Sequence, residues 1–170
     1  TLGSTADHLG LCIRLSRAAR ARVLSVDYRL APEFSFPAPV EDAIAAYRFL
    51  QAKGYLPHRI VPLGISAGGN IVLASLLAMK ERGYTLPPAA VCMSPITDMQ
   101  FAGESVTKNG QRDAITADRL HAIRTAYLSG RNASDALASP VRGVLRNLPR
   151  LYIQVGTYEL LLSDIGTFVE

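Results

Sequence analysis

The segment Gly64-Ile65-Ser66-Ala67-Gly68 decides how the rest of the chain is interpreted. Residues 60–63 predict a short buried strand, and residues 67–82 predict a helix, because their apolar side chains recur at helical spacing before Gly83. Ser66 therefore lies at a strand-to-helix turn, the pattern of a nucleophile elbow. The residues two before and two after the serine must be very small, and the hydroxyl projects beside the first helix amides. The alternative is a glycine-rich turn whose serine only caps the helix.

Strands and amphipathic helices alternate along the whole chain. We expect strands at residues 23–26, 60–63, 89–93 and 151–155, and helices at residues 4–19, 39–53, 67–82 and 116–130. The pattern predicts one α/β domain over residues 1–170 with a parallel sheet. Pro62 conflicts with a regular strand at 60–63, because proline has no N–H for a ladder. Either a bulge occurs there, or the strand begins later.

Polar residues follow several of the predicted strands. They are Asp27, Ser66, Asp98 and Glu159. Ligands of parallel α/β sheets bind at the carboxyl ends of the strands, so we expect these residues at one edge. A serine hydroxyl needs a base to take its proton, and a histidine base needs a carboxylate to orient it. Ser66 followed by Glu159 supplies the nucleophile and the acid in the order that α/β-hydrolases use.

Composition excludes several classes of protein. Hydrophobic residues make up 49% of the chain and charged residues 19%, which excludes a disordered chain. No apolar run approaches the length of a membrane span, and the N-terminus lacks the order of a signal peptide. The net charge of +4 comes without a nucleic-acid motif, so we expect no nucleic-acid partner. Cys12 and Cys92 lack metal-ligand spacing and indicate reduced thiols in a cytoplasmic protein.

The chain resembles the hormone-sensitive-lipase-like esterases, which are α/β-hydrolases that cleave carboxylic esters. The motifs that carry the resemblance extend over essentially the whole chain. They are Val26-Asp27-Tyr28-Arg29-Leu30-Ala31-Pro32-Glu33, Phe36-Pro37-Ala38, Glu41-Asp42, Ser66-Ala67-Gly68-Gly69-Asn70, Ser94-Pro95-Ile96-Thr97-Asp98, Leu137-Ala138-Ser139-Pro140 and Gln154-Val155-Gly156. The resemblance implies a three-layer sandwich of the α/β-hydrolase type.

The resemblance also implies roles for individual residues. It places Ser66 as the nucleophile, the amide of Ala67 as one oxyanion donor and Glu159 as the acid. Asp164 is the alternative acid. Ile65 stands where the family usually has aspartate, so the hydrogen bonds of that aspartate are lost. No metal and no organic cofactor is implied.

Two parts of the family pattern are absent from the sequence. The family has a His-Gly-Gly-Gly loop upstream of Gly3-Ser4, and its catalytic histidine lies a few tens of residues after the acid. We therefore interpret the chain as an internal fragment, incomplete at both ends. His8, His58 and His121 are poor substitutes for the base, and His58 is expected at the opposite edge of the sheet. Asp27, Asp42 and Asp98 are expected to be structural.

Three interpretations of function remain. The first is a serine carboxylesterase that forms an acyl-serine intermediate with a small-molecule ester; a homo-oligomer of the full-length protein is compatible with it. The second is a non-catalytic small-molecule-binding protein on the same fold. The third is that the fragment alone is inactive, because it lacks the base and part of the oxyanion hole.

Overall fold

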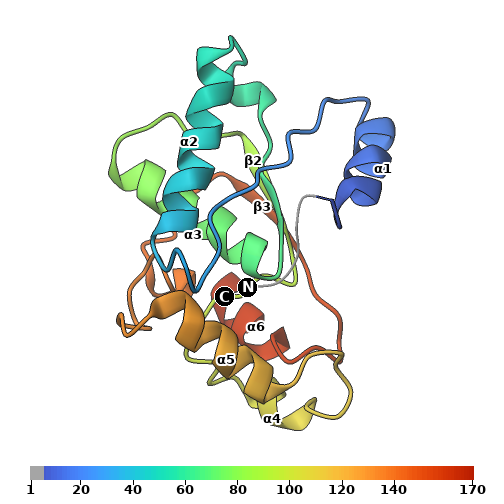
Figure 1. Ribbon diagram of the computed structural model, residues 1–170, viewed down its shortest axis with the longest axis vertical. Helices are drawn as coiled ribbons and strands as arrows, with labels where there is room; N and C mark the ends of the chain where they lie inside the picture. The colour runs from blue at the N-terminus through green and yellow to red at the C-terminus, as the bar shows by residue number, and fades with distance from the viewer. Residues whose placement is uncertain (1–5) are drawn as a thin grey trace.

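The computed structural model describes residues 6–170, which form a parallel sheet with flanking helices (Figure 1). The strands β1 (Leu63–Ile65), β2 (Ala89–Met93) and β3 (Arg150–Gln154) lie side by side in that order. Their register aligns Gly64 with Cys92 and Cys92 with Ile153. The predicted α/β fold with a parallel sheet is confirmed.

The helices flank the strands and fill the long connection before β3. They are α1 (Leu9–Ala19), α2 (Ala38–Ala52), α3 (Ala67–Glu81), α4 (Glu104–Lys108), α5 (Ala117–Leu128) and α6 (Leu162–Val169), with short 3-10 turns η1 (Pro57–Arg59) and η2 (Pro140–Arg142). The predicted helices correspond to α1, α2, α3 and α5, whereas α4 and α6 were not predicted. The expected start of the first helix at Ser4 lies outside the described residues.

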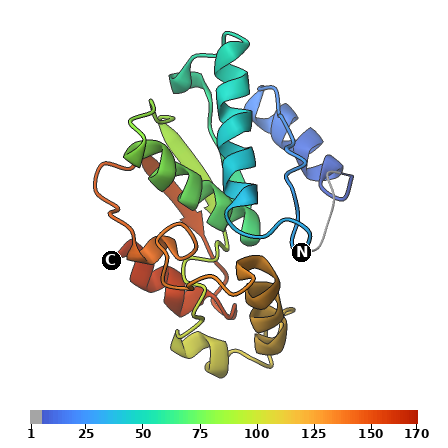
Figure 2. The same ribbon diagram turned by 60° about the vertical axis from the view of Figure 1, so that its left-hand side comes forward.

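One face of the sheet is covered by α3, which follows the elbow. Leu73 of α3 packs with Cys92 of β2 and Phe168 of α6, and all three are buried. In both views α2 lies beside α3, and α4, α5 and α6 gather at the lower end of the molecule (Figures 1 and 2). Leu63 and Tyr152 belong to the opposite row of side chains and are 36% and 63% exposed. The core therefore lies between the sheet and the helices on the face that α3 covers.

Two sequence predictions about strands need correction. Residues 23–26 are not a strand: Val23 and Leu24 are exposed, and no strand in the described part of the chain pairs with them. An apolar run becomes a strand only when a neighbour completes its backbone hydrogen bonds. The elbow strand begins at Leu63 instead of Ile60, which decides between the two explanations for Pro62. Pro62 precedes the strand, so the ladder does not require the N–H that proline lacks, and its carbonyl still accepts a bond from Val91 N at 2.9 Å.

Candidate active site

Ser66 lies at a sharp turn between β1 and α3. Its backbone has φ 54° and ψ −116°, a left-handed conformation that is rare for residues other than glycine. The turn is held by Ser66 N, which donates to Met93 O at 2.9 Å, and by Ser66 O, which accepts from Asn70 N at 3.1 Å. The serine side chain makes no capping hydrogen bond to the helix, which argues against a capping role. Ser66 is half-buried at the carboxyl edge of the sheet.

The tight turn depends on two glycines, but not on the pair that the motif suggests. A Cβ at Gly64 would lie 2.2 Å from Gly68 O, so the residue two before the serine must be glycine. A Cβ at Gly68 would meet nothing within 4 Å, which corrects the expectation for the residue two after. The restricted position is Gly69, where a Cβ would lie 2.7 Å from the Cβ of Pro95. The chain after β2 therefore packs directly against the start of α3.

The first turn of α3 supplies amides beside Ser66. Asn70 N donates to Ser66 O, so the amides of Ala67, Gly68 and Gly69 precede the first amide that has an intrahelical acceptor. These unpaired N–H groups and the helix dipole favour negative charge at this end of the helix. The geometry suits an oxyanion next to Ser66. The role of the Ala67 amide as a donor stays a prediction.

Glu159 lies just after β3, at the same edge of the sheet as Ser66. Its Oε1 accepts a hydrogen bond from Gly156 N at 2.7 Å, and its side chain is half-buried. Ser66 and Glu159 follow the two strands that flank β2. With strands about 4.8 Å apart, the ends of β1 and β3 are about 10 Å apart. An imidazole between them can bond to both side chains, one through each ring nitrogen.

The three histidines lie elsewhere. His8 directly precedes α1, and His58 lies in η1 at the amino end of β1, the opposite edge from Ser66. The ring of His121 packs edge-on against Phe101, with 5.9 Å between ring centroids. No hydrogen bond joins His58 or His121 to Ser66 or Glu159. The structure thus brings the predicted nucleophile and the predicted acid to one edge of the sheet, and neither His58 nor His121 is hydrogen-bonded to Ser66 or Glu159.

Asp164, the alternative acid, is buried on α6. Its neighbours are Asp98 and the amide of Gly103. The pKa of Asp164 is raised to about 6: burial is the largest cause, the nearby Asp98 acts in the same direction, and the hydrogen bond from the Gly103 amide opposes both. Asp98 and Asp164 line a cavity of about 200 Å³, and Asp164 Oδ2 has no hydrogen-bond partner there. Asp164 is 7% exposed, so the half-buried Glu159 is the more accessible carboxylate for a base.

Two other carboxylates have structural partners, as the sequence predicts. Asp42 forms an ion pair with Arg29 at 2.7 Å, and the Arg29 hydrogen bonds hold the pKa of Asp42 below its ordinary value. Asp98 accepts from Ser139 Oγ at 3.1 Å and pairs with Arg142 at 3.2 Å. The first ion pair joins α2 to the segment before it, and the second joins the segment after β2 to η2.

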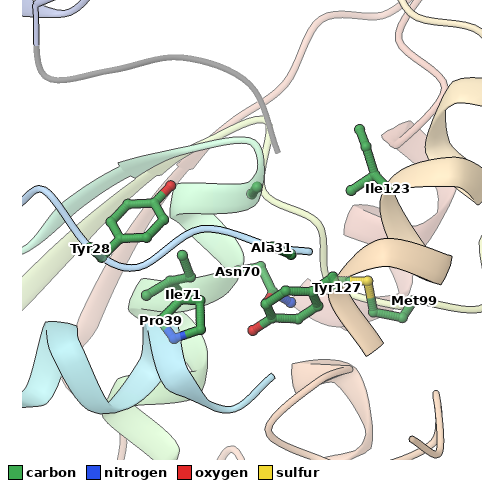
Figure 3. A pocket seen from close by; sticks show the side chains of 9 residues that line it. Tyr28, Ala31, Pro39, Asn70, Ile71, Met99, Ile123 and Tyr127 are labelled. Carbon is green, nitrogen blue, oxygen red and sulfur yellow. The ribbon is translucent and has the colours of Figure 1, made fainter. Parts of the chain in front are cut away.

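A small pocket lies beside the start of α3, and its lining includes Tyr28, Asn70 and Tyr127 (Figure 3). Its volume is about 10 Å³, room for about one water molecule, so it does not hold an acyl chain. Asn70 Oδ1 and Tyr127 Oη are buried without a partner, and burial strongly raises the pKa of Tyr127. Asn70 Nδ2 instead ties α3 to the carbonyls of Ile96 and Ala138, both at 2.8 Å.

Three further residues contact the segment around Glu159, and the sequence did not predict these contacts. Ser105, Asn109 and Asp113 each bond to residues 157–163. Single polar residues in an irregular segment have no periodicity that indicates burial, so nothing in the sequence marks their contacts.

Among residues 6–170, no group of three or more histidine, cysteine, aspartate or glutamate side chains is arranged to hold a metal ion. No helix in that range is long and apolar enough to cross a membrane.

Comparison with known proteins finds similarity to proteins named as ester hydrolases. A family model described as the alpha/beta hydrolase fold matches residues 1–170. An acetyl-hydrolase of Streptomyces hygroscopicus is 45% identical over 165 residues, which are 96% of this chain and 55% of that protein. An esterase of Acinetobacter venetianus is 33% identical over 171 residues, with 99% and 56% covered.

A solved esterase from the bacterial hormone-sensitive lipase family superimposes closely on this chain. The TM-score is 0.95 at 48% identity, over 98% of this chain and 56% of that structure. The chain thus spans about half the length of the relatives it matches.

Proposed function

The chain belongs to the α/β-hydrolase fold family, and on that premise we propose that it carries the nucleophile and the acid of a serine carboxylesterase. Ser66 attacks the ester carbonyl, and the amide of Ala67 stabilises the oxyanion. Glu159 orients a histidine base that sequence outside residues 1–170 supplies, together with the remaining oxyanion donors. The alcohol of the ester leaves with the proton that the base took from Ser66, and water then hydrolyses the acyl-serine to a carboxylic acid and free Ser66. On this proposal, residues 1–170 are part of one hydrolase domain.

The observation that carries the proposal is the backbone of Ser66. A serine held at φ 54° costs about 1–3 kcal/mol, and such strain persists where the surroundings enforce it, often at functional sites. Here Gly64 and Gly69 allow the close packing that enforces it. The relatives named acetyl-hydrolase and esterase support a small-molecule carboxylic ester as the substrate. Two free thiols, Cys12 and Cys92, support a cytoplasmic location.

Labelling with a fluorophosphonate tests the proposal in the full-length protein. We expect covalent labelling of Ser66, and its loss in Ser66→Ala. Ser94→Ala is a matched control, because Ser94 follows β2 at the same edge and also has a positive φ, 47°. This control should keep the label on Ser66. A full-length protein that binds ester analogues but takes no label would instead be a non-catalytic binding protein.

A further inference from the structure

The backbone around Glu159 is held by a segment some fifty residues earlier in the chain. Asn109 Nδ2 donates to the carbonyl of Glu159 at 3.1 Å and to that of Thr157 at 3.5 Å. Asp113 Oδ2 accepts from the amide of Leu160 at 2.7 Å. Peptide groups on both sides of the Glu159 side chain are therefore fixed by side chains of residues 105–113, which we call the clamp segment.

Ser105 adds a second point of attachment. Its Oγ donates to Leu160 O at 2.5 Å and accepts from Ser163 N at 2.9 Å. In return, Ser105 N donates to Ser163 Oγ at 3.1 Å. This reciprocal pair joins the beginning of α4 to the beginning of α6. The position that follows Glu159 is thus bonded through both its amide and its carbonyl.

The clamp segment owes its structure to these contacts. Its helix α4 has five residues, too few to be stable alone, and buries only Ser105 and Val106. Ser105 and Asn109 are 3% and 6% exposed. Buried polar groups need hydrogen-bond partners, and these two find theirs in residues 157–163. The clamp segment and the turn that carries Glu159 therefore depend on each other for their structure.

The Glu159 carboxylate is fixed to its own turn but not directly to the sheet. Oε1 accepts from Gly156 N, and a Cβ at Gly156 would lie 2.8 Å from Oε1, so a larger residue would disturb the contact. The turn itself continues past the end of β3 and has no neighbouring strand there. The distance from the carboxylate to Ser66 consequently depends on what holds the turn, and the clamp segment is what holds it.

We propose that Ser105, Asn109 and Asp113 are positioning residues that set the Glu159 carboxylate at the distance a histidine base needs. This inference rests on the proposed function, because it assigns these residues a role through Glu159. Displacement of a catalytic group by about 1 Å costs about 100-fold in rate. Loss of the Asn109 bonds should lower kcat 10- to 100-fold and leave KM within about twofold, because the proposed role acts on the position of the Glu159 carboxylate rather than on substrate binding.

A double-mutant cycle in the full-length enzyme tests this role. Asn109→Ala is measured alone and combined with Glu159→Ala, with p-nitrophenyl butyrate as substrate and active sites counted by fluorophosphonate titration. A residue that acts through Glu159 has no further effect once Glu159 is gone, so kcat should fall less than threefold in the second background. Asn132→Ala is the control: Asn132 is exposed in the same connection, and its side chain accepts from Ser134 N.

The outcomes separate the two proposals. Unchanged kcat in Asn109→Ala, or an equal loss with and without Glu159, overturns the positioning role. Hydrolysis that survives Ser66→Ala overturns the proposed function instead. If Asn109→Ala does not fold, Asp113→Ala goes through the same cycle, because Asp113 is less buried than Asn109 and alanine removes the carboxylate that accepts from Leu160 N. An unchanged kcat there would equally overturn the role.

Discussion

A methyl group added at Gly64 should unfold the elbow, whereas the same group at Gly68 should not. A Cβ on Gly64 would lie 2.2 Å from Gly68 O, 2.4 Å from Gly68 C and 2.6 Å from Gly69 N. All three are backbone atoms in the first turn of α3, so no side chain can rotate away. Overpacking of this kind typically costs about 1–3 kcal/mol, and we place Gly64→Ala at about 3 kcal/mol or more because the backbone itself must move.

For the matched variant Gly68→Ala, we expect the free energy of unfolding to rise instead of fall. Nothing lies within 4 Å of a Cβ at Gly68, and the residue is helical. Replacing glycine by alanine inside a helix stabilises by about 0.5–1 kcal/mol. Urea unfolding of the full-length protein, followed by circular dichroism, measures both free energies of unfolding. The reasoning is refuted if Gly64→Ala falls within 1 kcal/mol of the wild type, or if Gly68→Ala destabilises as much as Gly64→Ala.

Three further outcomes are expected. The pKa of Asp164, about 6 when folded, exceeds its ordinary value of 3.8, so the stability that this group contributes is fully present below pH 3.8 and is lost as the pH rises through 6. Asp164→Asn should therefore raise the free energy of unfolding at pH 8 by about 1–2 kcal/mol and lose that advantage by pH 4. Thr116→Ala should cost about 1 kcal/mol in thermal or urea unfolding, because Thr116 Oγ1 accepts from Arg119 N at the start of α5. Residues 1–170 alone should hydrolyse p-nitrophenyl butyrate no faster than their Ser66→Ala variant; a Ser66-dependent rate would show that they hold a base.

Features set by neighbouring residues could be read from the sequence. The strand at 89–93 was predicted with the bounds that β2 has, and the strand-to-helix turn at Ser66 was predicted from five residues. The sequence also predicted a helix that starts at residue 116, where Thr116 caps α5, and a helix that ends before Gly83, whose backbone is left-handed. Each of these depends on steric limits or hydrogen bonds within a few residues, which composition and spacing express directly.

Features that depend on distant partners could not be read in the same way. Residues 23–26 have the composition of a strand, but a strand also needs a neighbour, and no described strand lies beside them. The helix α4 has no apolar periodicity, because it buries only Ser105, whose hydroxyl bonds to Leu160 O, and Val106. The sequence thus predicted the acid, Glu159, but none of the side chains that hold its loop.

The turn at Ser66 depends both on contacts between residues close in the sequence and on a contact with a distant residue. Gly64 must be small because of Gly68, four residues away, and the motif predicts that contact. Gly69 must be small because of Pro95, which follows β2. Pro95 is distant from Gly69 in the sequence, so no local sequence pattern predicts this contact. Its neighbour Ile96 then donates to Ser66 O at 3.2 Å, so the segment that restricts Gly69 also holds the carbonyl of the proposed nucleophile. The segment after β2 therefore helps to maintain the strained backbone of Ser66, as its own motif does. A substitution at Pro95 should relax this backbone even though the sequence Gly64-Ile65-Ser66-Ala67-Gly68 is unchanged.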